Sequence, residues 1–145
     1  MPSIKKSQVI GYTQEQMYAL VNDIPNYNQF VPWCVESRVL NQNDEEIRAT
    51  LGFAAKGLHK SFTTLNRLHP HKMIEIRLVD GPFKHLEGFW QFDKVDENTS
   101  RVSLDLEFEF STRLLGIMFG PIFNQVASTL VEAFCKRAKA VYSRD

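Results

Sequence analysis

Few residues in this chain of 145 amino acids could carry acid–base chemistry. His85 and Glu87 are two positions apart in the segment KHLEGFWQF, and side chains at that spacing lie on the same face of a β-strand. A histidine beside a carboxylate can act as a general acid–base pair. A solvent-exposed strand face explains the same residues more simply, and His59 and Arg67 are similar cases. We therefore favour a solvated face over an active site.

Motifs for other chemistries are missing from the sequence. It has no Gly-x-Ser-x-Gly motif, no glycine-rich phosphate loop and no His/Cys cluster with metal-ligand spacing. Cys34 and Cys135 are far apart, and two buried thiols fit better than one disulfide because nothing marks the chain as secreted. We therefore expect no catalytic residue, no bound metal and no catalytic cofactor.

Basic residues gather only near the end of the chain. Seventeen basic and seventeen acidic residues cancel, so no net charge favours nucleic acid or an anionic membrane. Lys136, Arg137, Lys139 and Arg144 form the late cluster. Cations near a helix C-terminus interact favourably with the helix dipole, and the same cluster could contact RNA phosphates. No aromatic residues are interleaved with it, so the sequence signal for nucleic-acid binding is weak.

Alternating apolar and polar residues predict a sheet with one buried face. The segment RVSLDLEFEF is the clearest case, and the same period of two recurs in EEIRATLGFAA, MIEIRLV and KHLEGFWQF, with an early strand near residues 4–10. Turn-forming residues separate these runs. Gly88 falls on the predicted inner face, where glycine marks a bend or a close approach. We expect one curved antiparallel sheet of six or seven strands.

Helical patterns lie on either side of most of these strands. Thr13 and Gln16 have the spacing of a capping box, which predicts a helix that Pro25 ends. Pro25 can then open a second short helix. Apolar residues at spacings of three and four from Phe119 onward predict a long C-terminal helix. The helix either starts at Pro121 or is kinked there, and we favour a kink because RLLGIMF already has a helical pattern.

The order of these elements predicts an α+β fold in which the sheet curls around the long helix. The space between them can hold a cavity, and the segment DIPNYNQFVPWC places Tyr27, Phe30 and Trp33 where they can either line that cavity or plug a solid core. No stretch approaches the roughly 20 apolar residues of a membrane span, and no signal peptide is evident. We expect a cytoplasmic protein. The apolar run at 114–119 could touch a bilayer surface, but burial against the sheet is the favoured explanation.

Three stretches together resemble the START-like family of coenzyme Q-binding proteins: VNDIPNYNQFVPWC, GPFKHLEGFWQF and FEFSTRLLGIMFGPIFNQVASTLVEAFCKRA. The closer resemblance is to its bacterial branch of ribosome association toxins and oligoketide cyclase-like proteins. It covers residues 1–145 as a single lipid-binding domain and implies a helix-grip, Bet v 1-like fold with a hydrophobic cavity. By position it implies ligand contacts at Tyr27, Phe30, Pro32, Trp33, Phe83, Leu86, Trp90, Phe119 and Phe123.

This resemblance implies two functions, and we favour the first, although both can hold for one protein. The first is non-enzymatic binding of ubiquinone or a related isoprenoid lipid in support of respiration, with the quinone as a ligand. The second is a toxin that binds the large ribosomal subunit and blocks subunit association. For that function the late basic cluster suggests Lys136, Arg137 and Lys139 as the contact. An antitoxin partner and transient contact with the inner membrane are left open. A polyketide cyclase ranks last because the predicted inner face lacks an acid or base.

Overall fold

The computed structural model describes residues 3–142 of the chain. Its elements follow in the order β1 (Ser3–Ile10), α1 (Gln14–Asn22), the 3-10 helix η1 (Ile24–Gln29), β2 (Cys34–Gln42), β3 (Glu46–Ala55), β4 (Leu58–His69), β5 (Met73–Asp80), β6 (Phe83–Asp96), β7 (Thr99–Phe110) and α2 (Arg113–Tyr142). This order confirms the predicted α+β fold.

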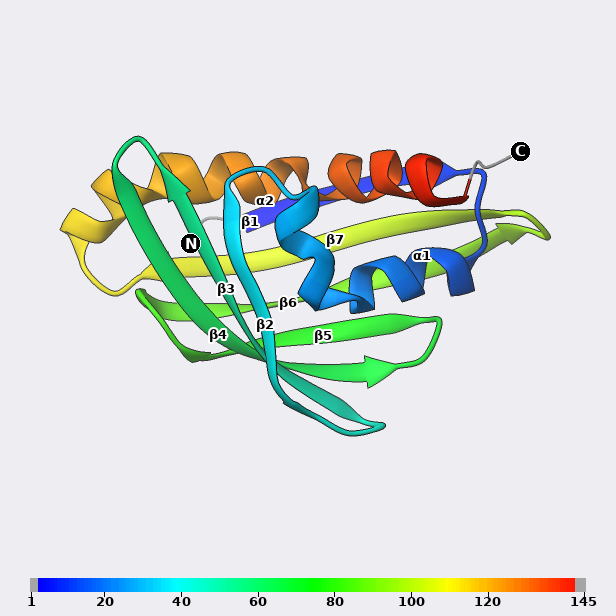
Figure 1. Ribbon diagram of the computed structural model, residues 1–145, viewed down its shortest axis with the longest axis horizontal. Helices are drawn as coiled ribbons and strands as arrows, with labels where there is room; N and C mark the ends of the chain where they lie inside the picture. Colours follow the sequence, from blue (N-terminus) through cyan, green and yellow to red (C-terminus); the bar gives the residue numbers. More distant parts are fainter. Residues whose placement is uncertain (1–2, 143–145) are drawn as a thin grey trace.

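All strands belong to one seven-stranded sheet with the order β1-β7-β6-β5-β4-β3-β2. Every neighbouring pair is antiparallel. The predicted alternation in β7 is confirmed, because Val102, Leu104, Leu106 and Phe108 are buried. Figure 1 shows α2 lying along β1 and β7, while β3 and β4 cross the view at a steep angle. The sheet therefore bends around the helix, as a helix-grip fold requires.

The two short helices form for local reasons that the sequence contains. The capping box at the start of α1 is confirmed: the Gln16 backbone N–H donates to Thr13 Oγ1 at 3.1 Å, and the Thr13 N–H donates to Gln16 Oε1 at 2.9 Å. Pro25 lies in the first turn of η1, where its missing N–H leaves no helix bond unmade. These two helices lead the chain from β1 to β2.

The long helix begins well before Pro121. Leu115 N–H donates to Thr112 Oγ1 at 3.1 Å, so a threonine cap fixes the start of α2. Pro121 lies inside the helix, which excludes the alternative in which the helix starts at that residue. A proline at this position removes one backbone hydrogen bond, and packing against the sheet offsets that loss.

The apolar stripe of α2 forms the core of the fold. The predicted stripe is confirmed, because Phe119, Phe123, Val126, Phe134 and Ala138 are all buried. Full burial of one phenylalanine side chain contributes about 1.5–3 kcal/mol. The helix therefore holds the curved sheet together along its length.

By length and composition alone, α2 could cross a membrane. This corrects the expectation that no segment comes near the length of a membrane span. One helix of this kind is weak evidence for a span, because the core helix of a soluble protein can pass the same test. A third of its most apolar stretch is buried, and Phe119, Phe123 and Phe134 are buried along the helix. The helix therefore gives no argument for a membrane span.

Gly88 allows β6 and β7 to approach each other closely. A Cβ atom at this position would lie 2.1 Å from the carbonyl oxygen of Asp105 and 2.8 Å from the Cα of Leu106. Leu106 is the residue directly opposite Gly88 in the ladder. The glycine is therefore explained by the neighbouring backbone and not by clearance for a ligand.

We expect Gly88→Ala to lower the free energy of unfolding by about 3 kcal/mol or more, since overpacking against backbone usually costs 1–3 kcal/mol and here nothing flexible can move away. Urea unfolding followed by circular dichroism measures this loss. Gly11→Ala is the matched control, because no atom lies within 4 Å of the added Cβ. Equal stability of the two variants would contradict this account of Gly88.

Candidate functional site

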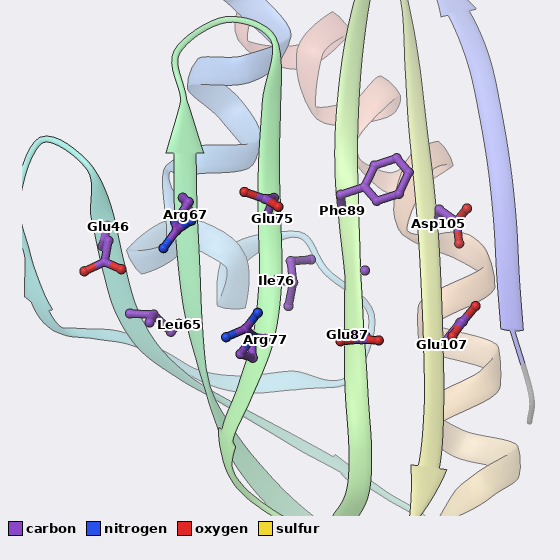
Figure 2. A pocket seen from close by; sticks show the side chains of 11 residues that line it. Glu46, Leu65, Arg67, Glu75, Ile76, Arg77, Glu87, Phe89, Asp105 and Glu107 are labelled. Atoms are coloured by element: carbon purple, nitrogen blue, oxygen red, sulfur yellow. The ribbon is translucent and has the colours of Figure 1, made fainter.

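The charged residues considered for acid–base chemistry lie on the outer face of the sheet. Arg67 and Glu87 line an open groove of about 340 Å³ on that face, together with other charged side chains (Figure 2). His85 Nε2 lies 3.5 Å from Glu87 Oε1. Leu86 and Trp90, which alternate with these residues along β6, are buried on the opposite face. The structure therefore places His85 and Glu87 on the outer side of β6, as the sequence predicted.

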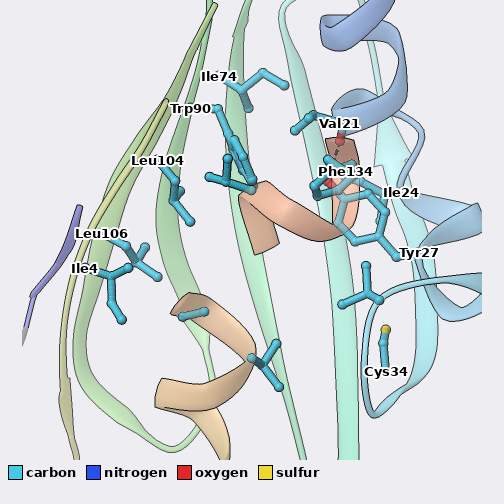
Figure 3. Close-up of a cluster of buried hydrophobic side chains, with 14 of the residues drawn as sticks. Ile4, Val21, Ile24, Tyr27, Cys34, Ile74, Trp90, Leu104, Leu106 and Phe134 are labelled. Carbon is cyan, nitrogen blue, oxygen red and sulfur yellow. Dashed lines mark hydrogen bonds between the residues drawn. The ribbon is translucent and has the colours of Figure 1, made fainter. Parts of the chain in front are cut away.

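An apolar cavity of about 80 Å³ lies between the inner face of the sheet and α2. Figure 3 shows several of its walls, including Ile24, Tyr27, Trp90, Leu104 and Leu106. The lining comes from η1 and the loop after it, from β3 to β7 and from α2: Ile24, Tyr27, Val31, Ala49, Leu51, Phe53, Phe62, Thr64, Asn66, Ile76, Leu86, Trp90, Leu104, Leu106, Phe123, Val126, Ala127 and Leu130. The cavity is where the fold could hold an apolar ligand.

Few polar groups reach this cavity. Thr64 Oγ1 donates to Asn66 Oδ1 at 2.9 Å, and the Tyr27 hydroxyl donates to the backbone carbonyl of Val21. Burial raises the pKa of Tyr27, with smaller contributions from the charges of Asp23 and Cys34, so the phenol stays neutral. Among the described lining residues there is no carboxylate, imidazole, amine, guanidinium or thiol. The cavity can bind apolar groups, but it offers no acid or base for proton transfer.

Sequence reasoning missed the two polar residues Thr64 and Asn66. A signal for them exists, because Phe62, Thr64 and Asn66 follow each other at every second position of β4 and so share one face. Because both side chains are polar, β4 lacks the regular alternation of apolar and polar residues that marks an inward-facing strand. Both are candidates for contacting a polar head group.

The structure brings together four of the nine predicted ligand residues. Tyr27, Leu86, Trp90 and Phe123 line the cavity. Their contact with a ligand stays a prediction.

Phe83 and Phe119 belong to an aromatic cluster beside the cavity. The Phe83 ring lies 4.9 Å from that of Phe123 and 4.8 Å from that of Phe110, between ring centroids, and the Phe119 ring lies 6.2 Å from that of Phe110. Both residues are buried. Phe83 supports the cavity wall by packing against Phe123, and neither Phe83 nor Phe119 is part of the lining.

The segment after η1 alternates between interior and surface. Val31 and Cys34 are buried, whereas Trp33 is 40% exposed. Trp33 has φ of 62°, a left-handed conformation that is uncommon for a bulky residue. Its carbonyl accepts a hydrogen bond from the Ala54 N–H at 3.0 Å. Trp33 therefore neither lines the cavity nor plugs the core, so for this residue both alternatives considered from the sequence were wrong.

Phe30 and Pro32 lie in a surface groove of about 310 Å³ together with Lys136 and Arg137 of α2. We call this the basic–aromatic groove. The Arg137 guanidinium lies 5.0 Å from the centroid of the Phe30 ring, and its Nη2 donates to Gln29 Oε1 at 3.2 Å. Sequence reasoning missed this groove, because its aromatic and basic residues are about a hundred positions apart.

Of the other predicted cations, Lys136 lines the groove and Lys139 does not. Lys136 Nζ is 3.3 Å from Glu132 Oε1 one helical turn away. Lys139 is exposed in the last turn of α2. Arg144 lies outside the described residues. Lys136 and Arg137 therefore bring two positive charges to the groove, and Glu132, which also lines it, brings one negative charge.

The apolar run at the start of α2 is only partly buried. Phe119 is buried, as expected, but Leu114 and Ile117 are each 64% exposed and Met118 is 46% exposed. The expectation that this run packs against the sheet was therefore wrong for these three residues. They lie at spacings that place them on one outward side of the helix.

Known proteins resemble the chain over almost its whole length. The family described as polyketide cyclase / dehydrase and lipid transport matches residues 10–135. A relative named ribosome association toxin RatA, from Vibrio cholerae serotype O1, is 44% identical over 98% of this chain and 99% of its own. A relative named coenzyme Q-binding protein COQ10 homolog B, mitochondrial, from Xenopus laevis, is 32% identical over 96% of this chain and 59% of its own.

Solved structures share the fold. The Zhui aromatase/cyclase from Streptomyces sp. R1128 superimposes with a TM-score of 0.83 at 14% identity and covers 98% of this chain and 97% of its own. A START superfamily protein from Mycobacterium smegmatis gives a TM-score of 0.79 at 18% identity over 96% of this chain and 98% of its own. At these identities the likeness concerns the fold alone.

The two cysteines are buried free thiols, as the sequence predicted. The Cys34 thiol donates to the Glu36 carbonyl at 3.3 Å. Burial raises the pKa of Cys34 to about 11. Burial also raises the pKa of Cys135. A thiol with a raised pKa is a poor nucleophile at neutral pH because the thiolate is the reactive form.

We expect Cys34 in a Cys135→Ala variant to react with iodoacetamide at pH 8 about 200-fold more slowly than in the urea-unfolded protein. With a pKa of about 11, roughly 0.1% of the thiol is ionised, against about a quarter for an unperturbed cysteine of pKa about 8.5. The rate should rise about tenfold per pH unit up to pH 10. A rate that levels off near pH 9, measured by mass spectrometry, would contradict this assignment.

Proposed function

The chain belongs to the polyketide cyclase / dehydrase and lipid transport family, and from that membership we propose that it is a non-enzymatic START-like domain that associates with the large ribosomal subunit. Its residues 1–145 act as one unit in this proposal. Relatives named ribosome association toxin support it, because they match this chain at 41–44% identity over nearly the full length. These names favour the ribosome over the quinone that ranked first from the sequence.

The observation that carries the proposal is the basic–aromatic groove. Phe30 and Pro32 meet Lys136 and Arg137 there, and Phe30 is the aromatic residue that the late basic cluster lacked in the sequence. Lysine and arginine neutralise RNA phosphates, and an arginine guanidinium lying over an aromatic ring, as Arg137 does over Phe30, offers a planar surface on which an unpaired base can stack. Ribosomal RNA presents both groups.

Arg137 is already positioned for such a contact. Its guanidinium rests over the Phe30 ring and is hydrogen-bonded to Gln29. A side chain held in place before binding loses less conformational entropy on binding. The groove therefore combines charge, a stacking surface and a fixed arginine on one side of the molecule.

We expect the triple charge reversal Lys136→Glu, Arg137→Glu and Lys139→Glu to weaken binding to purified large subunits at least about tenfold. Three lost phosphate contacts should make the plot of log K against log salt shallower by about 2 to 3 units. Co-sedimentation with large subunits at several salt concentrations measures both changes.

The matched control replaces Lys56, Lys60 and Lys94 by glutamate. These lysines are exposed and lie outside the groove, and the change in net charge is the same. This variant should bind like the wild type. If both triple variants lose the same affinity, general charge explains binding and the groove is not the contact. If neither loses affinity, the groove contact is excluded.

A second candidate function, binding of an isoprenoid quinone, is favoured by the apolar cavity. Trp90, Leu104 and Leu106 form part of its wall, and Thr64 and Asn66 contribute polar side chains to its lining. The relative named as a coenzyme Q-binding protein supports the same candidate. However, typical ligand pockets measure about 300–1,000 Å³, and this cavity measures about 80 Å³. A quinone would fit only if the cavity became several times larger, so this function ranks second.

We expect Ala127→Leu to reduce quinone uptake at least about tenfold and to leave ribosome association unchanged. Ala127 is buried and lines the cavity, so the larger side chain fills the space without an unmade polar contact. Extraction and mass spectrometry of protein incubated with ubiquinone measures uptake. Gln125→Leu, at an exposed position of α2, is the control. Equal uptake by both variants would remove the cavity from quinone binding.

An enzymatic function ranks lowest. Relatives matched over most of the chain have names that describe a toxin or a coenzyme Q-binding protein, and the described cavity lining carries no acid or base. The likeness to an aromatase/cyclase rests on the shared fold at 14% identity. We propose a cytoplasmic location, which follows from association with ribosomes.

A further inference from the structure

Three side chains of types that can ligate a metal lie close together on the outer face of the sheet. They are away from both the cavity and the basic–aromatic groove. His85 and Glu87 come from β6 and Glu107 comes from β7, and their ligand atoms all lie within 4.8 Å of one another. Figure 2 shows Glu87 and Glu107 side by side on neighbouring strands. The sequence contains no cluster of this kind, because Glu107 is distant from the other two along the chain.

The register of the sheet places two negative charges directly opposite each other. Glu87 pairs with Glu107 across β6 and β7, and on the other side Glu107 faces Ser3 of β1. Like charges at directly opposite positions destabilise a sheet. This pair therefore has an electrostatic cost that a bound cation would remove.

The acidic residues on either side of Glu107 have basic partners, whereas Glu107 has none. Asp105 lies 4.0 Å from Lys5 Nζ, and Glu109 lies 3.6 Å from Lys84 Nζ. Within residues 3–142, Glu107 forms no ion pair and no side-chain hydrogen bond. The uncompensated charge is therefore confined to the position next to His85 and Glu87.

His85 contributes a nitrogen that lacks a partner. Its Nε2 atom is buried and has no hydrogen-bond partner in the described part of the chain. Glu87 Oε1 lies 3.5 Å away, but the contact does not have hydrogen-bond geometry. A buried polar atom without a partner costs free energy, and coordination of a metal ion would satisfy it.

We propose that His85, Glu87 and Glu107 form a binding site for one divalent transition-metal ion of the Zn²⁺ type. Zn²⁺ binds histidine nitrogen and carboxylate oxygen and is commonly held by three protein side chains with a fourth position for water. Mg²⁺ prefers oxygen ligands in octahedral geometry, so the imidazole favours Zn²⁺ over Mg²⁺. The fourth position is open to a donor atom from water or from a binding partner.

Nearby cations limit the strength of this site. Arg77 is the residue opposite Glu87 on β5, and Lys5 and Lys84 lie beside the neighbouring acids. Their positive charge opposes a divalent ion. We therefore expect saturable binding of a single ion that is weaker than in a structural zinc site.

The test is calorimetric titration of tag-free, chelator-treated wild-type protein with ZnCl₂, followed by titration with MgCl₂. One Zn²⁺ should bind per chain, and Mg²⁺ should bind at least about tenfold more weakly. His85→Asn and Glu107→Gln should each weaken Zn²⁺ binding at least about tenfold, since the loss of even a partner of a ligand costs 10–100-fold.

His69→Asn is the matched control. His69 Nε2 lies 2.8 Å from Glu75 Oε2, so it is also a histidine beside a glutamate, but no third ligand group joins it among the described residues. This variant should keep the affinity of the wild type. If it loses as much affinity as His85→Asn, or if the wild type shows no saturable binding up to 1 mM Zn²⁺, the proposal is wrong.

A second measurement separates metal binding from a simple structural role of these residues. Without metal, Glu107→Gln should raise Tm by about 1 to 4 °C, because it removes the repulsion with Glu87. With Zn²⁺, the wild type should gain stability and the variant should not. A variant that is less stable than the wild type without metal, or that gains as much from Zn²⁺, would overturn the proposal.

Discussion

The packing of one long apolar helix face against the inner face of a curved sheet underlies every other feature of this protein. An antiparallel sheet with one apolar face needs cover, and α2 covers it along its length with Phe119, Phe123, Val126 and Phe134. Phe134 shows how closely the parts join, because its ring meets those of Tyr27, Phe30 and Trp90 at 5.1 to 5.2 Å between centroids. A single buried side chain thus connects α2, the sheet, and residues 24–34 around η1, which we call the lid segment.

Different residues of the lid segment, 24–34, line the two candidate sites. Ile24, Tyr27 and Val31 line the cavity, whereas Phe30 and Pro32 line the basic–aromatic groove with residues of α2. This connecting segment is therefore rich in large apolar residues because it contributes to both the cavity wall and the basic–aromatic groove. Any movement of η1 that enlarged the cavity would also move Phe30 relative to Arg137.

The outer face of the sheet follows from the same alternation that builds the core. Once Leu86 and Trp90 face inward, Glu87 must face outward, and pairing with β7 then sets Glu107 opposite to it. Gly88 lets the two strands approach closely at this point. The inner face was constrained by packing, while the outer face was left free to collect charges, including like charges side by side.

The sequence by itself determined the elements, because their signals are local. The capping box of Thr13 and Gln16, the alternation in β7 and the apolar stripe of α2 depend on neighbouring residues and were all found in the structure. Four of the predicted cavity residues also line the cavity, since alternation assigns each strand residue to a face.

Only the tertiary structure decided which distant residues meet and which way a loop residue points. Trp33 faces solvent because its backbone adopts a left-handed conformation, and no periodicity applies outside regular elements. Phe30 meets Arg137 across the fold, and Glu107 meets Glu87 through strand register. The size of the cavity was equally beyond the sequence, because it depends on how the side chains of several elements fill one shared space.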